Sequence, residues 1–188
     1  MTRRATTDSA AVAIASVDSP LGPLWLAMRG AEAVAIGWDD EDALRSELAE
    51  RGFDELRADP AGVAPLRDAL QAYFAGREPT LPPICRQGLT PFTHEVLTAL
   101  TAVRRGGTTS YGRLAARTGR PIGASRAIGG AVGRNPLPIL WPCHRVLQGD
   151  GSLGGFSGGL PRKRWLLQFE SITWREPARA SATEGVNP

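Results

Sequence analysis

The segment SYGRLAARTGRPIGASRAIGGAVGRN, residues 110–135, predicts two short helices around a turn at Gly119–Ile122. Ser110 is placed to cap the first helix, because a serine oxygen can accept hydrogen bonds from the free N–H groups at a helix start. This is the spacing of a helix-turn-helix, although an ordinary helical hairpin has the same pattern. The segment therefore predicts a helical unit in the second half of the chain.

The second of these helices carries glycines in its interior. Each glycine costs a helix roughly 1 kcal/mol relative to alanine, so Gly129 and Gly130 need a reason. Arg126 precedes Gly129, Gly130 and Gly133 by three, four and seven residues, which places one arginine and three glycines on one helix face. Such a face can pack tightly against another helix or lie in a nucleic-acid groove, and the arginine favours the groove.

Charge divides the 188 residues into an acidic and a basic part. Residues 1–90 carry 9 Arg against 14 Asp or Glu, whereas residues 91–170 carry 11 Arg or Lys against 3 Asp or Glu. The net charges of these parts are −5 and +8. A basic domain favours a polyanionic partner such as nucleic acid, and a basic surface without a partner is the alternative.

The acidic part predicts a small antiparallel sheet and two helices. The expected elements are strands at 11–18, 23–30 and 32–39 and helices at 41–51 and 64–75. The proline-rich segment 78–91 predicts a linker. We therefore expect a first domain over residues 1–88.

The basic part predicts a helix that begins after Thr90, with Pro91 in its first turn. A final helix is expected over 159–170, followed by a polar segment. These patterns give a second domain over 89–170 and a mobile tail over 171–188.

Cys143 and His144 stand side by side in NPLPILWPCHRV, residues 135–146. Three prolines predict an extended lead-in that delivers Cys143 to a fixed place. Neighbouring side chains of an extended chain point to opposite faces, which disfavours a direct hydrogen bond between the two. A contact through a water, or by a local bend, stays possible. Cys85 and His94 have no partner at ligand spacing and are expected to be structural or incidental.

Residues 91–170 closely resemble the active-site domain of the 6-O-alkylguanine-DNA alkyltransferases, the methylated-DNA-protein-cysteine methyltransferases. The resemblance rests on TTSYGRLAARTG, SRAIGGAVGRNP and NPLPILWPCHRVLQGDGSLGGFSGGLPRKRWLLQFE, in which PCHRV is highly specific. The first half fits more loosely and resembles the family's ribonuclease-H-like domain. The resemblance implies an α/β (α+β) fold, with a small antiparallel sheet in the first domain and a winged-helix-like second domain that carries the helix-turn-helix.

The resemblance also implies a reaction. The alkyl group would pass from the guanine 6-oxygen to Cys143 in one in-line displacement, irreversibly and once per chain. His144 would take the thiol proton through a water, and Glu170 would orient its imidazole. Tyr111 would donate toward the guanine ring nitrogen as the base leaves.

The partner implied by the resemblance is double-stranded DNA containing 6-O-alkylguanine, bound through the minor groove with the damaged nucleotide rotated out. Arg126 would fill the vacated stack, with a phosphate contact as its alternative. The other expected binding residues are Ala127 and Gly129 against the groove, Asn135 as a hinge, Ser157 at the modified oxygen, Phe156 as a pocket wall, and the carbonyls of Cys143 and Val146 at the exocyclic amine.

Two residues depart from the family pattern. Phe156 stands where most relatives carry tyrosine, so the hydroxyl is absent and the aromatic wall remains. Trp141 replaces an aliphatic residue, which affects local packing or pocket size. The family's occasional N-terminal zinc site lacks its cysteines and histidines here, so we expect no metal and no cofactor.

Two other functions stay open on the sequence. One is a protein that flags alkylated DNA without repairing it, as alkyltransferase-like proteins do; these carry tryptophan at the cysteine position, so Cys143 argues against it. The other is a cysteine hydrolase, which would turn over repeatedly. No apolar run approaches the roughly 18 residues of a membrane span. We expect a cytoplasmic monomer with reduced thiols and no signal peptide.

Overall fold

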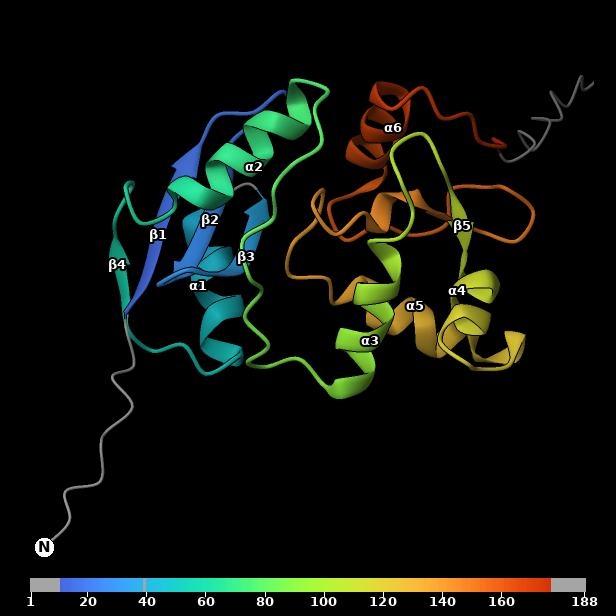
Figure 1. Cartoon of the computed structure of the whole chain (residues 1–188), viewed down its shortest axis with the longest axis horizontal. Coiled ribbons are helices and arrows are strands. Elements are labelled where there is room, and N and C mark those ends of the chain that lie inside the picture. Colours follow the sequence, from blue (N-terminus) through green and yellow to red (C-terminus); the bar gives the residue numbers. More distant parts are fainter. Residues whose placement is uncertain (1–10, 39, 177–188) are drawn as a thin grey trace, which may run out of the picture.

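A four-stranded sheet organises the N-terminal lobe of the computed structural model, which describes residues 11–38 and 40–176 (Figure 1). The strands are β1 (Val12–Val17), β2 (Leu24–Arg29), β3 (Glu32–Trp38) and β4 (Leu56–Ala58), in the order β3-β2-β1-β4. The first three are antiparallel neighbours, as predicted. The sheet is not wholly antiparallel, because β4 joins it parallel to β1. This strand has only three residues, two of them exposed, and shows no apolar pattern in the sequence.

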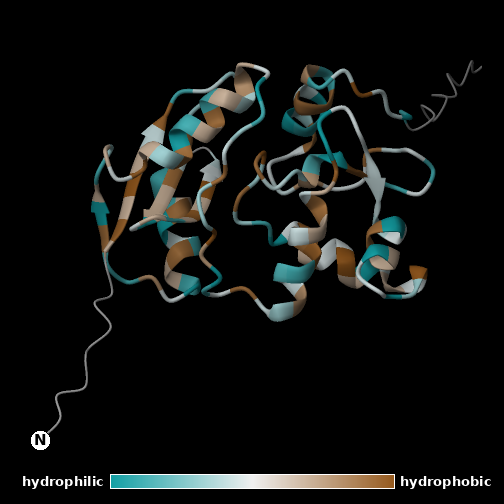
Figure 2. Ribbon diagram, in the orientation of Figure 1, coloured by the Kyte–Doolittle hydropathy of each residue, from teal (hydrophilic) through white to brown (hydrophobic). Residues whose placement is uncertain are grey.

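One helix covers each face of this sheet. The side chains of β2 alternate between the faces, since successive residues of a strand point to opposite sides. Leu24, Leu26 and Met28 pack with α2 (Ala64–Phe74), whereas Ala27 packs with α1 (Glu41–Glu50). Both helices lie where the sequence predicts them. Figure 2 shows the neighbouring strands β1 and β2 as largely hydrophobic, the short strand β4 as largely hydrophilic and the helices with residues of both kinds.

The edge of β3 is covered by segments from later in the chain. Ala33 N donates to Pro83 O at 2.7 Å, and Cys85 N donates to Ala33 O at 2.9 Å. Further along the same strand, Ile36 N donates to Pro136 O at 2.8 Å. The proline-rich segment is therefore more than a linker, because it satisfies backbone groups that an open sheet edge would expose.

Helices form most of the C-terminal lobe. The elements are α3 (Pro91–Leu100), β5 (Thr109–Ser110), α4 (Tyr111–Arg117), η1 (Ile122–Ala124), α5 (Ser125–Gly133), η2 (Cys143–Arg145), β6 (Val146–Leu147) and α6 (Leu160–Phe169). The elements η1 and η2 are short 3-10 helices. Thr90 and Ser110 cap α3 and α4 as predicted, each accepting from the backbone N–H three residues later. The turn between α4 and α5 includes Gly119 at φ +68°, a conformation that glycine adopts readily.

The two lobes share one apolar core. Its buried residues include Leu70 of α2, Leu97 of α3, Ile128 of α5 and Leu166 of α6. Within the described residues, no helix is long and apolar enough to cross a membrane.

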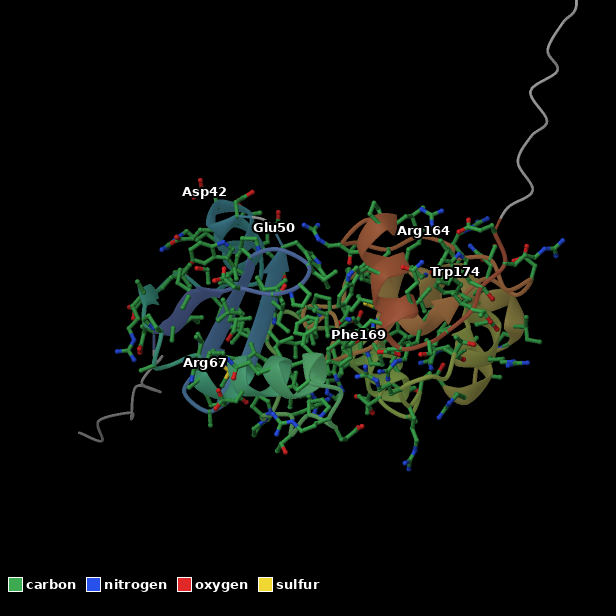
Figure 3. The ribbon with its side chains drawn as sticks, turned by 90° about the horizontal axis from the view of Figure 1, so that it is seen from above. Asp42, Glu50, Arg67, Arg164, Phe169 and Trp174 are labelled. Atoms are coloured by element: carbon green, nitrogen blue, oxygen red, sulfur yellow. The ribbon has the colours of Figure 1, made fainter. Side chains whose placement is uncertain are left out.

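Residues directly after α6 pack on the body, although a mobile tail was predicted to begin at residue 171. Ile172 is buried with Leu147, Leu153 and Leu167, and Trp174 packs against this cluster. Arg175 N donates to Gly151 O, and Glu176 accepts from Trp174 and Arg164 (Figure 3). The side chains of Ile172 and Trp174 bury apolar surface here, and the sequence pattern did not predict this packing. The rest of the predicted tail, residues 177–188, lies outside the described part.

Candidate active site

Cys143 lies in a tight turn and not in an extended segment. The preceding residues also turn, because Trp141 N donates to Leu137 O at 2.8 Å and Ile139 adopts φ +75°. The predicted extended lead-in is therefore wrong. The prolines restrict the chain, but Asn135 folds it back, donating to Trp141 O at 2.8 Å and accepting from Leu137 N at 3.0 Å.

The same amide of Asn135 reaches the sulfur. Its Nδ2 donates to Cys143 Sγ at 3.0 Å, and both side chains are buried. Burial raises the pKa of the Cys143 thiol to about 11, although the Asn135 hydrogen bond and the positive charge of Lys163 act in the opposite direction. Asn135 thus connects the end of α5 to the Cys143 sulfur.

His144 occupies the next position of the turn and is fully buried. Its Nε2 lies 2.9 Å from Glu170 Oε1, at the end of α6. Burial lowers the pKa of His144, and the neighbouring Glu170 partly offsets this. A neutral ring that donates from Nε2 to a carboxylate keeps Nδ1 as an acceptor. Nδ1 has no hydrogen-bond partner among the described protein atoms, so its lone pair is free to accept a proton.

Glu170 accepts hydrogen bonds from other side chains besides His144. Arg145 binds it in a bidentate pair, Nε to Oε2 and a terminal nitrogen to Oε1, both at 2.8 Å. Tyr73 of the N-terminal lobe donates its hydroxyl to Oε1 at 2.7 Å. Burial raises the pKa of Glu170, but the hydrogen bonds from His144 and Arg145 outweigh it and hold the pKa well below its usual range. The carboxylate therefore stays charged and fixed.

Lys163 of α6 is fully buried. It lies against the glycine-rich loop, residues 148–159, which joins β6 to α6. Its Nζ donates to the carbonyls of Val146, Leu153 and Gly155, which uses all three ammonium hydrogens. The predicted amine-binding carbonyl of Val146 is thus already one acceptor for Lys163, and its second lone pair remains. The lysine joins the Cys143 turn to the loop that carries Phe156 and Ser157.

Tyr111, the first residue of α4, connects the sulfur to the glycine face of α5. Burial raises its pKa, and so does the nearby Cys143. A Cβ placed on Gly129 would lie 3.7 Å from the Tyr111 ring. On Gly130 it would meet only the side chain of Arg134, and on Gly133 nothing within 4 Å. No other helix packs on Gly130 or Gly133, so tight helix packing does not explain these two glycines.

Arg126 and Ala127 lie exposed on α5, whose buried side is formed by Ile128, Ala131 and Val132. The exposed face therefore combines a cation, small residues and an accessible backbone. This is a surface that another molecule can approach closely.

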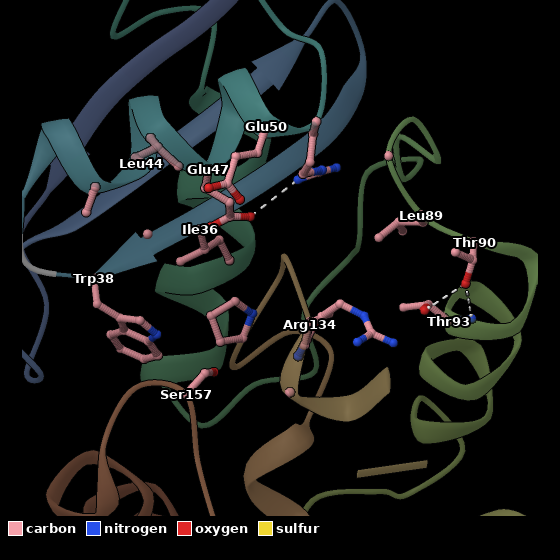
Figure 4. Close-up of a pocket in the computed structure, with 17 residues that line it drawn as sticks. Ile36, Trp38, Leu44, Glu47, Glu50, Leu89, Thr90, Thr93, Arg134 and Ser157 are labelled. Atoms are coloured by element: carbon pink, nitrogen blue, oxygen red, sulfur yellow. Dashed lines mark hydrogen bonds and ion pairs between the residues drawn. The ribbon is translucent and has the colours of Figure 1, made fainter. Parts of the chain in front are cut away.

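Phe156 and Ser157 follow on the glycine-rich loop. Ser157 is exposed and lines a cavity of about 560 Å³ between the lobes, which Asn135, Arg134 and Trp38 also line (Figure 4). Phe156 is half-buried against Trp38, with ring centroids 6.1 Å apart. The structure thus brings Ser157 and the sulfur-binding Asn135 to one cavity.

Trp141 is buried in the shared core, 6.2 Å from His94 between ring centroids. It belongs to the same core cluster as Ala33 and Leu66 of the N-terminal lobe. The departure from the family pattern at this position therefore falls on the packing between lobes. His94, predicted to be structural, packs on it.

The sequence did not predict a role for three residues of the site: Tyr73, Arg145 and Lys163. Arg145 adjoins His144 in the sequence, and its position was a usable signal. Tyr73 and Lys163 gave none, because each lies in a helix whose pattern is explained by packing. Within the described residues, no three His, Cys, Asp or Glu side chains gather as a metal site would require.

Comparison with known proteins places this geometry in a family. The model of the 6-O-methylguanine DNA methyltransferase DNA binding domain matches residues 91–172, and that of the ribonuclease-like domain matches residues 12–82. The chain belongs to the 6-O-methylguanine DNA methyltransferase family. The predicted family and the predicted α/β (α+β) fold are both confirmed.

Individual members of the 6-O-methylguanine DNA methyltransferase family are similar over most of the chain. A methylated-DNA-protein-cysteine methyltransferase of Salmonella typhimurium is 41% identical over 162 residues, which cover 82% of this chain and 92% of the relative. One from Mycobacterium bovis is 37% identical over 167 residues, covering 87% and 93%. The structure of Mycobacterium tuberculosis OGT in complex with DNA matches with a TM-score of 0.71 at 36% identity, over 85% of this chain and 93% of that one.

Proposed function

We propose that this protein repairs alkylated guanine in DNA by transferring the alkyl group from the guanine 6-oxygen to Cys143. One observation carries the assignment of the acceptor. The Cys143 sulfur is held by Asn135 beside a histidine whose Nε2 is fixed by Glu170 and whose Nδ1 is unpaired. That arrangement supplies a nucleophile and a base of the right tautomer in one buried turn.

In the proposed reaction Cys143 loses its proton through a water to His144 Nδ1, and the sulfur attacks the alkyl carbon. The carbon–oxygen bond breaks as the sulfur–carbon bond forms, and its electron pair passes to the guanine. Tyr111 donates a proton toward the guanine ring nitrogen, which offsets the charge that develops there. The raised pKa of the thiol makes the base necessary, since few thiolates exist at neutral pH without it.

The same residues define the proposed binding mode. The exposed face of α5, with Arg126, Ala127 and Gly129, lies against the minor groove, and Arg126 fills the stack left by the flipped nucleotide. Ser157 faces the modified oxygen, Phe156 forms the pocket wall, and the carbonyls of Cys143 and Val146 accept from the exocyclic amine. Asn135 serves as the hinge between α5 and the active-site turn.

The product explains why the protein would act once. A thioether lacks the electrophilic carbonyl that lets an acyl-enzyme hydrolyse, so Cys143 keeps the alkyl group. All the proposed groups come from one chain, which suits a monomer. Both cysteines are free thiols, and we place the protein in the reducing cytoplasm.

Intact mass spectrometry tests this proposal. Wild-type protein incubated with a duplex containing 6-O-methylguanine should gain the mass of one methyl group, on the peptide that contains Cys143, and then stop. Cys143→Ala should gain none while keeping most of its DNA affinity, because the basic helices make the phosphate contacts. Repeated turnover would favour a hydrolase. Tight binding without a mass gain would favour a protein that only flags the lesion.

A further inference from the structure

The loop that carries Ser157 is held from the other lobe. Trp38, the last residue of β3, packs edge-on against Phe156 at 6.1 Å between centroids. Gly158 lies so close that a Cβ placed on it would be 2.7 Å from Trp38 Cε2 and 2.9 Å from Nε1. The residues on both sides of Ser157 therefore contact one indole.

A third contact closes this arrangement. The guanidinium of Arg162, at the start of α6, stacks over the Trp38 ring at 5.0 Å and donates to Gly158 O at 3.2 Å. Trp38 thus lies among Phe156, Gly158 and Arg162. Figure 4 shows its ring reaching from the end of β3 to the loop, next to Ser157.

The same strand also supports the opposite side of the cavity. Ile36 N donates to Pro136 O, directly after Asn135, whose amide binds the Cys143 sulfur. Two residues along β3, Trp38 contacts the loop. Because Asn135 and Ser157 line one cavity, β3 is placed to fix the distance between its two walls.

We infer that Trp38 is a positioning residue for alkyl transfer, holding residues 156–158 so that Ser157 faces the base that delivers its alkyl group to Cys143. This inference rests on the proposed function. It gives the N-terminal lobe a part in the reaction, because the position of Ser157 then depends on a residue of that lobe. A displaced reacting group of about 1 Å can cost a hundredfold in rate.

The test compares Trp38→Ala with Trp25→Ala. Trp25 lies on neighbouring β2, is also half-buried and packs on the opposite face of the sheet. Single-turnover rates are measured with duplex DNA containing 6-O-methylguanine or 6-O-benzylguanine, together with melting temperatures. Trp38→Ala should slow methyl transfer roughly tenfold or more and change the ratio of benzyl to methyl rates. Trp25→Ala should lower the melting temperature and leave both rates and their ratio close to wild type.

Two further variants separate positioning from general damage. Trp38→Phe should recover most of the rate, because a ring still supports Phe156 and the loop. Gly158→Ala should slow transfer in the wild type, since its Cβ would lie 2.7 Å from the indole of Trp38 and 2.8 Å from the ring of Phe156. In a Trp38→Ala background the added cost should be smaller, which a double-mutant cycle detects.

Equal rates and equal benzyl-to-methyl ratios in Trp38→Ala and wild type would overturn the inference. So would parallel losses of rate in Trp38→Ala and Trp25→Ala that follow their losses of stability. The wild type is assayed in the same series, so an absence of transfer by it would contradict the proposed function itself. Normal transfer by both proteins would contradict only the role of Trp38.

Discussion

The hydroxyl of Tyr73 in the N-terminal lobe donates a 2.7 Å hydrogen bond to Glu170 at the end of the last helix. The accepting oxygen is the one that also binds the imidazole of His144. The two residues are 97 positions apart in the sequence, and both are buried. The N-terminal lobe therefore contacts both the glycine-rich loop, through Trp38, and the carboxylate that holds His144, the proposed general base, through Tyr73.

Tyr73→Phe should slow alkyl transfer severalfold while keeping the fold. The variant retains the ring in the core but removes one donor to a buried carboxylate, which costs about 1.5–3 kcal/mol. Single-turnover rates and urea unfolding measure the two effects. Unchanged transfer despite the lost stability would show that the hydroxyl supports packing alone.

His144→Ala should change the pH dependence of transfer. Burial lowers the pKa of His144, so its neutral form persists below the usual value of about 6.5 and wild-type transfer should decline only at more acidic pH. Without the base, transfer needs a spontaneous thiolate and should rise with pH toward the Cys143 pKa of about 11. If the transfer rates of both proteins depend on pH in the same way, His144 is not the base.

Glu170→Gln combined with His144→Ala should cost less than the sum of the single effects. The carboxylate acts through the imidazole, so its loss matters little once the imidazole is gone. Melting temperatures are needed beside the rates, because Arg145 would keep a buried charge without its partner. Strict additivity would indicate that Glu170 acts only through the fold.

Lys163→Met should raise the pKa of Cys143 further and destabilise the protein. The substitution removes a positive charge that lowers this pKa. It also leaves the carbonyls of Val146, Leu153 and Gly155 without their donor, and the two buried hydrogen bonds, to Val146 and Leu153, cost about 1–3 kcal/mol each when lost. Ultraviolet titration of the thiolate and chemical denaturation measure the changes. A thiol pKa equal to that of the wild type would show that the charge does not reach the sulfur.

Arg126→Ala should weaken transfer from duplex DNA far more than transfer from the free alkylated base. Unstacking costs a few kcal/mol and applies only where there is a stack, so a mismatched target should suffer less. Arg117→Ala, an exposed arginine on α4, is the matched control. Equal losses on duplex and free base would assign Arg126 a structural part.

A chain that ends at Ser171 should melt at a lower temperature than one that ends at Glu176. The shorter chain loses Ile172 and Trp174 from their apolar cluster, and burying one such side chain is worth about 1.5–3 kcal/mol. Differential scanning calorimetry of both chains gives the comparison. Equal melting temperatures would mean that these contacts add nothing.

The sequence by itself determined the main helices, the three long strands and the neighbouring pair Cys143 and His144. Local capping at Thr90 and Ser110 and the apolar spacing of the helices involve residues a few positions apart, so they can be predicted from the order of residues alone. PCHRV and its neighbours were specific enough to indicate the family, and Cys143 within them is the proposed acceptor.

Tertiary structure decided how the site is held. The three-residue strand β4 exists only because β1 offers its edge, and the Cys143 turn exists because Asn135 binds backward across six residues. Tyr73 reaches the site from the distant helix α2. Lys163 reaches it from the buried face of α6, and Trp38 from the end of β3. Their roles follow from tertiary packing: a buried polar group needs a hydrogen-bond partner, and an aromatic ring needs a surface to pack against. These partners come from distant parts of the chain, so no local sequence pattern predicts them.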